Sequence, residues 1–354
     1  MLLDRLDRYI ARNVLGAMLV VQVMVLGLDL VISYINDLGD VSGNYSAFDV
    51  LLYLLMRLPW RFYEYAPVAV LIGALVGLGS MASSNELTVM RAAGRSLGRI
   101  LIGVLKPLLL VILITMGIGE FVSPATEQHA AAWRLEQSEG ADAVLERGGG
   151  WQREGDNFYR FGTIRADDTV INVRRYEYDG QRLVEASEAQ RAVWNGKAWT
   201  LENVKTTYFD ANGTRVESQP TAIWHTDLTP AQLNRLLRPL NSQRMSSLWQ
   251  YASYLRSQGQ EATQPLLYFW QKSLLPVTLA GLVLLAASFV FGPLRSVAAG
   301  TRIFYGVIVG LSFKYLQDLL APASVLFGFS PSLAVVVPTA VCYLLGFWLL
   351  RRTG

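Results

Sequence analysis

Residues 14–35 read VLGAMLVVQVMVLGLDLVISYI, an apolar run in which Asp29 is the single charged residue. A helix that crosses the apolar layer of a bilayer needs roughly 20 mostly apolar residues. The run is therefore long enough to span a membrane as one helix. It is too long for a secretory signal peptide, and no small-x-small cleavage site follows it, so we expect it to remain in the mature protein.

Further runs of similar character predict an α-helical polytopic membrane protein with six transmembrane helices. Their expected limits are Val14 to Ile35, Tyr65 to Ala82, Ile100 to Val122, Leu274 to Val290, Ile303 to Leu320 and Leu333 to Leu350. Between the third and fourth runs lies a polar stretch, residues 123–265. The expected domains are thus 1–122 and 266–354, with three transmembrane helices each, and the insert 123–265.

The composition of the whole chain agrees with a membrane protein. Of 354 residues, 52% are hydrophobic and 17% are charged, against about a quarter charged in soluble domains. A net charge of +3 without a basic tract gives no reason to expect a nucleic-acid partner. The single cysteine, Cys342, can form no intrachain disulfide, and two histidines are too few for a histidine-rich metal site.

Arginine in the short loops predicts the orientation, because positive charge marks the cytoplasmic side. One side holds Arg5, Arg8, Arg12, Arg91, Arg95, Arg99, Arg295, Arg302, Arg351 and Arg352. The short loops of the other side hold Arg57 and Arg61. We therefore expect both termini in the cytoplasm and the insert in the periplasm.

The insert has the pattern of a β domain. Stretches rich in Val, Tyr, Trp and Thr are separated by Asp179-Gly180, Asn195-Gly196 and Asn212-Gly213, and such pairs favour tight hairpin turns. These signals predict an antiparallel sandwich or jelly roll, followed after Pro230 by a helical return to the membrane. Trp199 and Leu201 lie out of phase with Val204, which indicates a bulge between them. Such a domain is either a small rigid unit or a site for another β protein or a lipid chain.

No catalytic motif accompanies these elements. The chain has no G-x-x-x-x-G-K-[ST] loop, no H-E-x-x-H, no G-x-S-x-G and no paired cysteines. We therefore expect no catalytic residue and no cofactor in this chain. Any energy for work has to come from another chain.

The loop between the second and third predicted helices suggests a contact with such a chain. Ser83 and Glu86 have capping-box spacing and Gly94 is a suitable stop, so the sequence predicts a short cytoplasmic helix over residues 84–96. We expect it to present Glu86, Met90 and Arg91 to the cytoplasm. Either Glu86 merely caps its own helix, or the helix docks on a cytoplasmic motor.

Several charged residues lie within or beside the predicted membrane spans. Lys314 and Asp318, four residues apart, share one helical face. Charges at that depth cost about 2.5 to 3.5 kcal/mol on insertion scales, so they usually face a cavity or a partner. They either line a path or form a self-compensating pair.

Charged residues are also expected toward the outer side of the membrane. Asp29 and Glu64 are placed there, and Arg57 and Arg61 lie at the interface, where they either meet lipid phosphates or anchor the helix. Gly73-x-x-x-Gly77 and Gly306-x-x-x-Gly310 allow close helix approach.

The layout and several stretches resemble the LptF/LptG permease family of the lipopolysaccharide-export ABC transporter, and within it LptG more than LptF. The stretches are Leu6-Asp7-Arg8-Tyr9-Ile10, Asn85-Glu86-Leu87 through Arg91-Ala92-Ala93-Gly94, Trp270-Gln271-Lys272 followed by Pro276, and Phe291-Gly292-Pro293-Leu294-Arg295 leading to Arg302. The resemblance covers nearly the whole chain, and the Glu86 loop is its most specific motif.

The resemblance implies a non-catalytic permease subunit in the bacterial inner membrane. It implies an LptF-like sister subunit, a dimer of the ATPase LptB that binds ATP and magnesium, and LptC. Lipopolysaccharide would enter between the first span of one subunit and the fifth of the other, and pass to a periplasmic β-jelly-roll bridge. By the same resemblance Glu86, Leu87, Met90, Arg91 and Gly94 would contact LptB, while Asp29, Arg57, Arg61, Lys314 and Asp318 are candidates for the substrate cavity or gate.

Two other functions remain open from the residues. One is a non-transporting, membrane-anchored β scaffold for envelope assembly. The other is an intramembrane hydrolase that uses Asp29 and Glu64 or Asp318, although no spacing supports such a pair.

Overall fold

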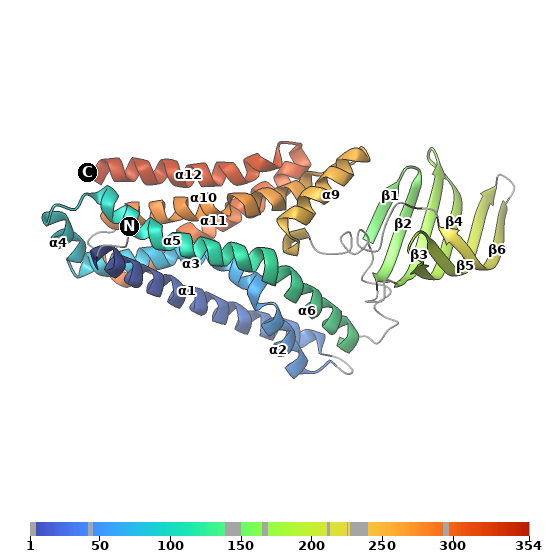
Figure 1. The fold of residues 1–354 in the computed structure, drawn as a ribbon, viewed down its shortest axis with the longest axis horizontal. Coiled ribbons are helices and arrows are strands. Elements are labelled where there is room, and N and C mark those ends of the chain that lie inside the picture. Colours follow the sequence, from blue (N-terminus) through green and yellow to red (C-terminus); the bar gives the residue numbers. More distant parts are fainter. Residues whose placement is uncertain are drawn as a thin grey trace.

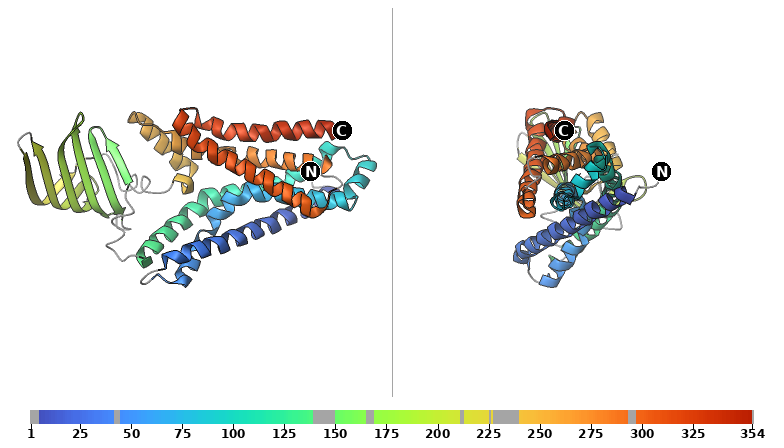
Figure 2. Two further views of the ribbon diagram at one scale, coloured as in Figure 1. Left: turned by 180° about the vertical axis from the view of Figure 1, so that it is seen from behind. Right: turned by 90° about the vertical axis from the view of Figure 1, so that its left-hand side faces the viewer.

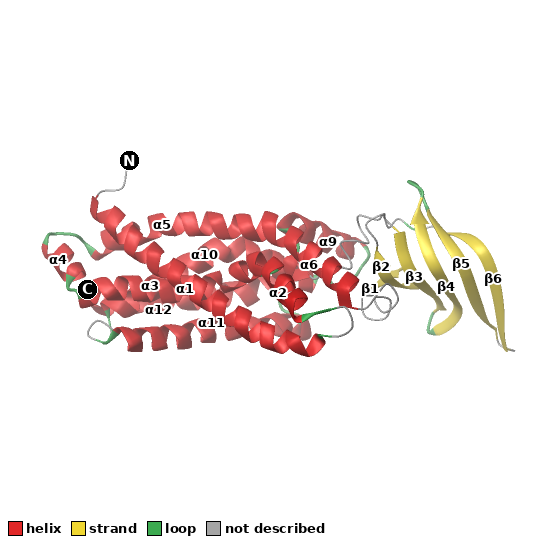
Figure 3. Cartoon of the chain, turned by 90° about the horizontal axis from the view of Figure 1, so that it is seen from below, coloured by secondary structure: helices red, strands yellow, loops and turns green. Residues whose placement is uncertain are grey.

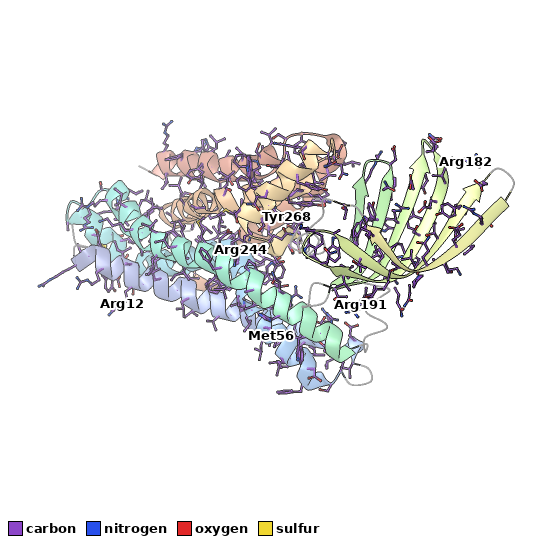
Figure 4. All side chains as sticks on the ribbon, turned by 45° about the vertical axis from the view of Figure 1, so that its right-hand side comes forward. Arg12, Met56, Arg182, Arg191, Arg244 and Tyr268 are labelled. Carbon is purple, nitrogen blue, oxygen red and sulfur yellow. The ribbon has the colours of Figure 1, made fainter. Side chains whose placement is uncertain are left out.

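A computed structural model describes residues 5–41, 45–138, 150–164, 169–210, 213–224, 226, 240–292 and 297–353. A long helical bundle occupies one end and a β-sheet the other (Figure 1). Both termini lie at the end of the bundle farthest from the sheet, as the view from below also shows (Figure 3). Arg12 and Arg182 mark the two opposite ends of the molecule (Figure 4).

The first part of the chain forms helices, and those at the predicted spans extend beyond their expected limits. They are α1 (Arg5–Asp37), α2 (Ala47–Met56), α3 (Leu58–Ser83), α4 (Glu86–Ala92), α5 (Leu97–Gly117), a π-helical turn η2 (Ile118–Val122) and α6 (Ser123–Ser138). After the sheet come α9 (Met245–Ser257), α10 (Thr263–Phe291), α11 (Ala299–Phe327) and α12 (Pro331–Thr353). Residues 123–138, expected in the β insert, are thus helical and extend the third predicted span.

Five helices in the described part of the chain are long and apolar enough to cross a membrane. They are Arg5–Asp40, Leu58–Ser83, Leu97–Ala130, Thr263–Phe291 and Pro331–Arg352. The fifth predicted span lies in α11, which is not among them and carries Lys314 and Asp318. Its 29 residues reach roughly 44 Å at 1.5 Å per residue. This is enough to cross a bilayer, and α11 packs within the bundle against α3 and α12.

The centre of the bundle is formed by α3 and α10. In the most apolar 18-residue stretch of α3, 72% of the residues are buried, whereas in that of α1 only 17% are buried. Helix α1 accordingly lies at the edge of the bundle in the end-on view (Figure 2). Glycines bring the outer helices close to α3. A Cβ at Gly73 would lie 2.4 Å from Met18 Cα, and one at Gly306 would lie 2.7 Å from Leu75 Cδ1. Both predicted glycine pairs therefore serve close helix packing.

The insert is one antiparallel sheet whose strands pair in chain order. They are β1 (Gly150–Glu154), β2 (Asn157–Ile164), β3 (Thr169–Asp179), β4 (Arg182–Trp194), β5 (Trp199–Asp210) and β6 (Gly213–Trp224). The predicted turns at Gly180 and Gly196 have positive φ, 62° and 93°, as tight hairpins require. Asn212 of the third predicted turn lies outside the described residues, although β5 and β6 do pair as a hairpin.

The sheet curls around an aromatic core. Strands β2 and β6 are separated by three strands, which in a flat sheet would hold them roughly 19 Å apart. Yet the rings of Tyr159 in β2 and Trp224 in β6 have centroids 4.9 Å apart. Trp199 and Phe161 are completely buried in the same core. The expected antiparallel β domain is therefore present, but the described strands form one curled sheet and not two stacked sheets.

A break in the pairing crosses this sheet from β2 to β6. The register skips one residue on each strand: Gly162, Asn172, Gln190, Asn203 and Pro220. Asn172 and Asn203 have positive φ, 58° and 53°, a conformation that asparagine tolerates better than most residues. The break rotates β5, so that Val204 shares the core with Trp199 and Leu201. The phase change in the sequence was a correct signal, but the break extends over five strands.

We expect Gly73→Ala to lower the free energy of unfolding by about 1–3 kcal/mol, because the new methyl group would overlap the α1 backbone. The measurement is the midpoint of thermal unfolding in detergent. Gly27→Ala is a matched control, because a Cβ there meets nothing within 4 Å. Equal midpoints for the two variants would contradict the close contact between α1 and α3.

Candidate functional site

The short helix α4 lies at the end of the bundle that holds the termini. It runs from Glu86 to Ala92 and is shorter than the predicted 84–96. Gly94, with a φ of 87°, ends it as expected. The predicted capping box is absent, because α3 continues to Ser83 and Asn85 precedes α4 in a left-handed conformation. The Ser83 hydroxyl donates instead to the Ser80 carbonyl.

The side chains of α4 divide into an anchoring face and an exposed face. Leu87 and Met90 are buried in the core of the bundle, so the expectation that Met90 faces the cytoplasm is wrong. Val89 and Arg91 are exposed, and Glu86 is half-buried. A pocket of about 350 Å³ lies between α4 and the end of α10, with Arg91 and Phe291 in its lining. Any direct contact with another chain therefore falls to the exposed face.

A buried carboxylate links α4 to the membrane helices. Asp7 of α1 is 1% exposed. It accepts hydrogen bonds from Arg95, just after α4, at 2.6 Å and from Lys106 of α5 at 3.0 Å. Two cations around one buried carboxylate offset its loss of hydration. The sequence predicts Arg95 only as a cytoplasmic charge. It gives no sign of this cluster, because Arg95 and Lys106 lie 88 and 99 positions from Asp7.

Two of the gate candidates bind each other between α1 and α3. The Arg61 guanidinium donates to Asp29 and, at 2.7 Å, to the Ser33 hydroxyl. The Tyr65 hydroxyl donates to Asp29 at 2.7 Å. Both charged side chains are largely buried. Arg61 is therefore engaged within the chain, which favours the anchoring interpretation over a lipid-phosphate contact.

Arg57 is engaged in the same way. Its Nε donates to Glu127 of α6 at 2.9 Å, and its guanidinium lies over the rings of Tyr53 and Trp60. Tyr53 belongs to α2, a short apolar helix that was not among the elements expected from the sequence. Ser46 and Asp49 form its capping box, and their S-x-x-D spacing before an apolar run was a signal that could have revealed this helix.

The remaining gate candidates lie on α11. Lys314 is 3.3 Å from Glu64 of α3 and 3.5 Å from Asp318, so the predicted pair within the helix exists and has a partner on another helix. The three side chains line a pocket of about 410 Å³ between α3, α10 and α11. Asp29 and Glu64 each bind a different cation, so the structure does not bring them together as a carboxylate pair.

Lys272, the last residue of the stretch Trp270-Gln271-Lys272, occupies a buried junction. Its ammonium donates to the carbonyls of Gly119 at 2.9 Å and Gln243 at 2.6 Å, and it lies over the ring of Tyr63. Gly119 belongs to η2, where a Cβ would lie 2.4 Å from Tyr63. Lys272 thus joins α3, α10, the π-helical turn and the segment before α9. A lone lysine in an apolar stretch gave no sign of these partners.

Removal of one partner tests the pair of Arg61 and Asp29. Arg61→Met leaves a largely buried carboxylate without its cation, so we expect a loss of about 3–5 kcal/mol in the free energy of unfolding. The double variant with Asp29→Met should recover most of that loss, because the charge is then removed as well. Thermal unfolding in detergent measures both. A double variant no more stable than Arg61→Met would refute the pairing.

Comparison with known proteins agrees with this architecture. The family model described as lipopolysaccharide export system permease LptF/LptG matches residues 8–352. The chain is 32% identical over 356 residues to the lipopolysaccharide export system permease protein LptG of Haemophilus influenzae, with 99% of each chain covered. It is 31% identical over 353 residues to LptG of Escherichia coli, with 98% of each chain covered. The inferred resemblance is confirmed, including the likeness to LptG. The chain belongs to the LptF/LptG family of lipopolysaccharide export permeases.

Proposed function

We propose that this chain is a non-catalytic transmembrane subunit of an ATP-driven exporter that extracts lipopolysaccharide from the inner membrane and passes it to a periplasmic β bridge. One observation carries the proposal. The helix α4 is anchored by Leu87 and Met90 under the central helices, at the end of the bundle opposite the sheet. An ATPase that binds the exposed face of α4 could displace this helix, and the buried face would transmit the displacement to the helices that it contacts.

The ion pairs of Asp7 connect α4 to α1 and α5, so they could transmit such a displacement. Arg95 follows α4 directly and binds Asp7 of α1, and Lys106 binds the same carboxylate from α5. Close packing at Gly73 joins α1 to α3. Displacement of α4 would therefore move α1 with it, since breaking the buried cluster would leave charges unpaired.

The apolar surface of α1 supports a role at an interface with lipid or a sister subunit. Leu19, Val23, Leu28 and Ile32 are each more than half exposed along this helix. Soluble monomers rarely expose so large an apolar face. On α11, Phe304 and Leu319 are exposed in the same way. In the proposed exporter, α1 and α11 would line the two lateral openings shared with the sister subunit.

The family and the apolar helices indicate an inner-membrane protein. For the assembly we propose an LptF-like sister subunit, LptC, and an LptB dimer that contacts α4 and itself binds ATP and magnesium. The proposed substrate is lipopolysaccharide. We place both termini in the cytoplasm and the sheet in the periplasm, as the distribution of arginine favours.

We expect Glu86→Arg to leave the subunit inserted and folded but to reduce co-purification of LptB, or ATP-driven release of lipopolysaccharide from vesicles, by about tenfold, the equivalent of 1.4 kcal/mol in a contact. Reversal of charge on the docking face removes a charged contact with the motor. Arg351→Glu, an exposed charge reversal at the same end of the bundle, is the control. Normal association and release by Glu86→Arg would count against α4 as the coupling helix.

A further inference from the structure

The outer face of strands β1 to β3 carries an aromatic cleft that the proposed function does not use. Its volume is about 500 Å³, and its lining includes Trp151, Phe158, Tyr176 and Tyr178 together with Arg153 and Asp156. These residues face away from the core, because Tyr159, the neighbour of Phe158, points inward to Trp224. The cleft is therefore a surface feature and no part of the sheet's own interior.

The rings of the cleft contact one another in pairs. Trp151 and Tyr176 stack with centroids 5.7 Å apart and an interplanar angle of 28°. Phe158 and Tyr178 meet edge to face at 5.4 Å, and the Arg153 guanidinium lies 5.3 Å from the Phe158 centroid. Trp151 is nevertheless 60% exposed. Preformed aromatic surfaces with a few polar groups at the rim are typical of ligand sites.

The charge around the cleft favours an acidic ligand. Arg160 lies directly opposite Trp151 in the register of β1 and β2, so both side chains occupy the same face. The charged residues of the lining are Arg153 and Asp156, and Arg160 adds a second arginine beside the cleft on the same face. Arginine binds carboxylate and phosphate groups through two parallel hydrogen bonds.

The cleft also lies close to the point where the chain enters the helical bundle. Gln260, in the turn between α9 and α10, donates from Nε2 to the Arg153 carbonyl at 2.9 Å. Strand β1 is the strand nearest the helices (Figure 1). A molecule anchored in the membrane beside α10 could therefore reach the cleft with a polar headgroup.

We propose that this cleft binds acidic sugar rings, those that carry carboxylate or phosphate, in the saccharide part of the exported glycolipid. The proposal rests on the proposed function for the identity of that glycolipid. Sugar rings present flat C–H faces that pack on Trp151 and Tyr176. Arg153 and Arg160 receive the acidic groups, and Asp156 accepts hydrogen bonds from hydroxyl groups.

The test is calorimetric titration of the purified full chain with lipid-free oligosaccharide released from lipopolysaccharide by mild acid. We expect saturable binding that Trp151→Ala weakens by about tenfold or more, since the stacking surface is lost. Trp249→Ala removes a similarly exposed tryptophan from α9 and should leave affinity unchanged. Arg160→Gln should weaken binding and reduce its dependence on salt. Unchanged unfolding midpoints establish that each variant is folded.

Three results would overturn the proposal: no binding of the oligosaccharide, equal affinity of wild type and Trp151→Ala, or equal binding of a neutral maltohexaose. Its failure is distinguishable from failure of the proposed function. ATP-driven lipid release by a reconstituted wild-type complex, without oligosaccharide binding, would refute only the cleft. Absence of that release would refute the exporter.

Discussion

The buried carboxylate of Asp7, held by Arg95 and Lys106, joins the parts of the chain that the proposed mechanism requires to move together. A carboxylate that is 1% exposed is costly to bury alone. Its two cations come from the segment after α4 and from α5, so the cluster persists only if α1, α4 and α5 keep their relative positions. These hydrogen-bonded ion pairs thus restrict the relative positions of the three segments more specifically than apolar packing alone would.

Close packing extends this constraint to α3. Gly73 and Gly77 bring the backbones of α1 and α3 together, and the Lys272 junction attaches η2 and α10 to the first half of α3. By contrast, α11 meets α3 closely at Gly306, whereas near Lys314 the two helices are connected by an ion pair beside a pocket. In the proposed mechanism this region is where α11 changes position as the cavity narrows.

The features that the sequence predicted are those with local signals. Long apolar runs, glycine pairs at a spacing of four, Asp-Gly and Asn-Gly turns and the phase change before Val204 each reflect short-range geometry. In the described residues, five of the six predicted spans are helices apolar enough to cross a membrane, both glycine pairs lie at helix contacts, the turns at Gly180 and Gly196 have positive φ, and the register breaks just before Val204. The curl of the sheet was beyond such reasoning, because it depends on contacts such as that of Tyr159 with Trp224. The partners of Arg57, Arg61 and Lys272 likewise come from distant segments. Met90, expected to face the cytoplasm with Glu86 and Arg91, is instead buried with Leu87, because α4 packs against the bundle core.

The most direct measurement is a pulsed electron-electron spin resonance distance between α1 and α11. Spin labels at Ile35→Cys and Leu319→Cys, both exposed, are introduced with Cys342→Ser, and the chain is reconstituted with its sister subunit and ATPase. The account predicts that ATP binding changes this distance and that Asp7→Asn, in a complex that still binds ATP, greatly reduces the change. An unchanged distance on ATP binding, or an equal change with Asp7→Asn, would contradict the transmission of motion from α4 through Asp7.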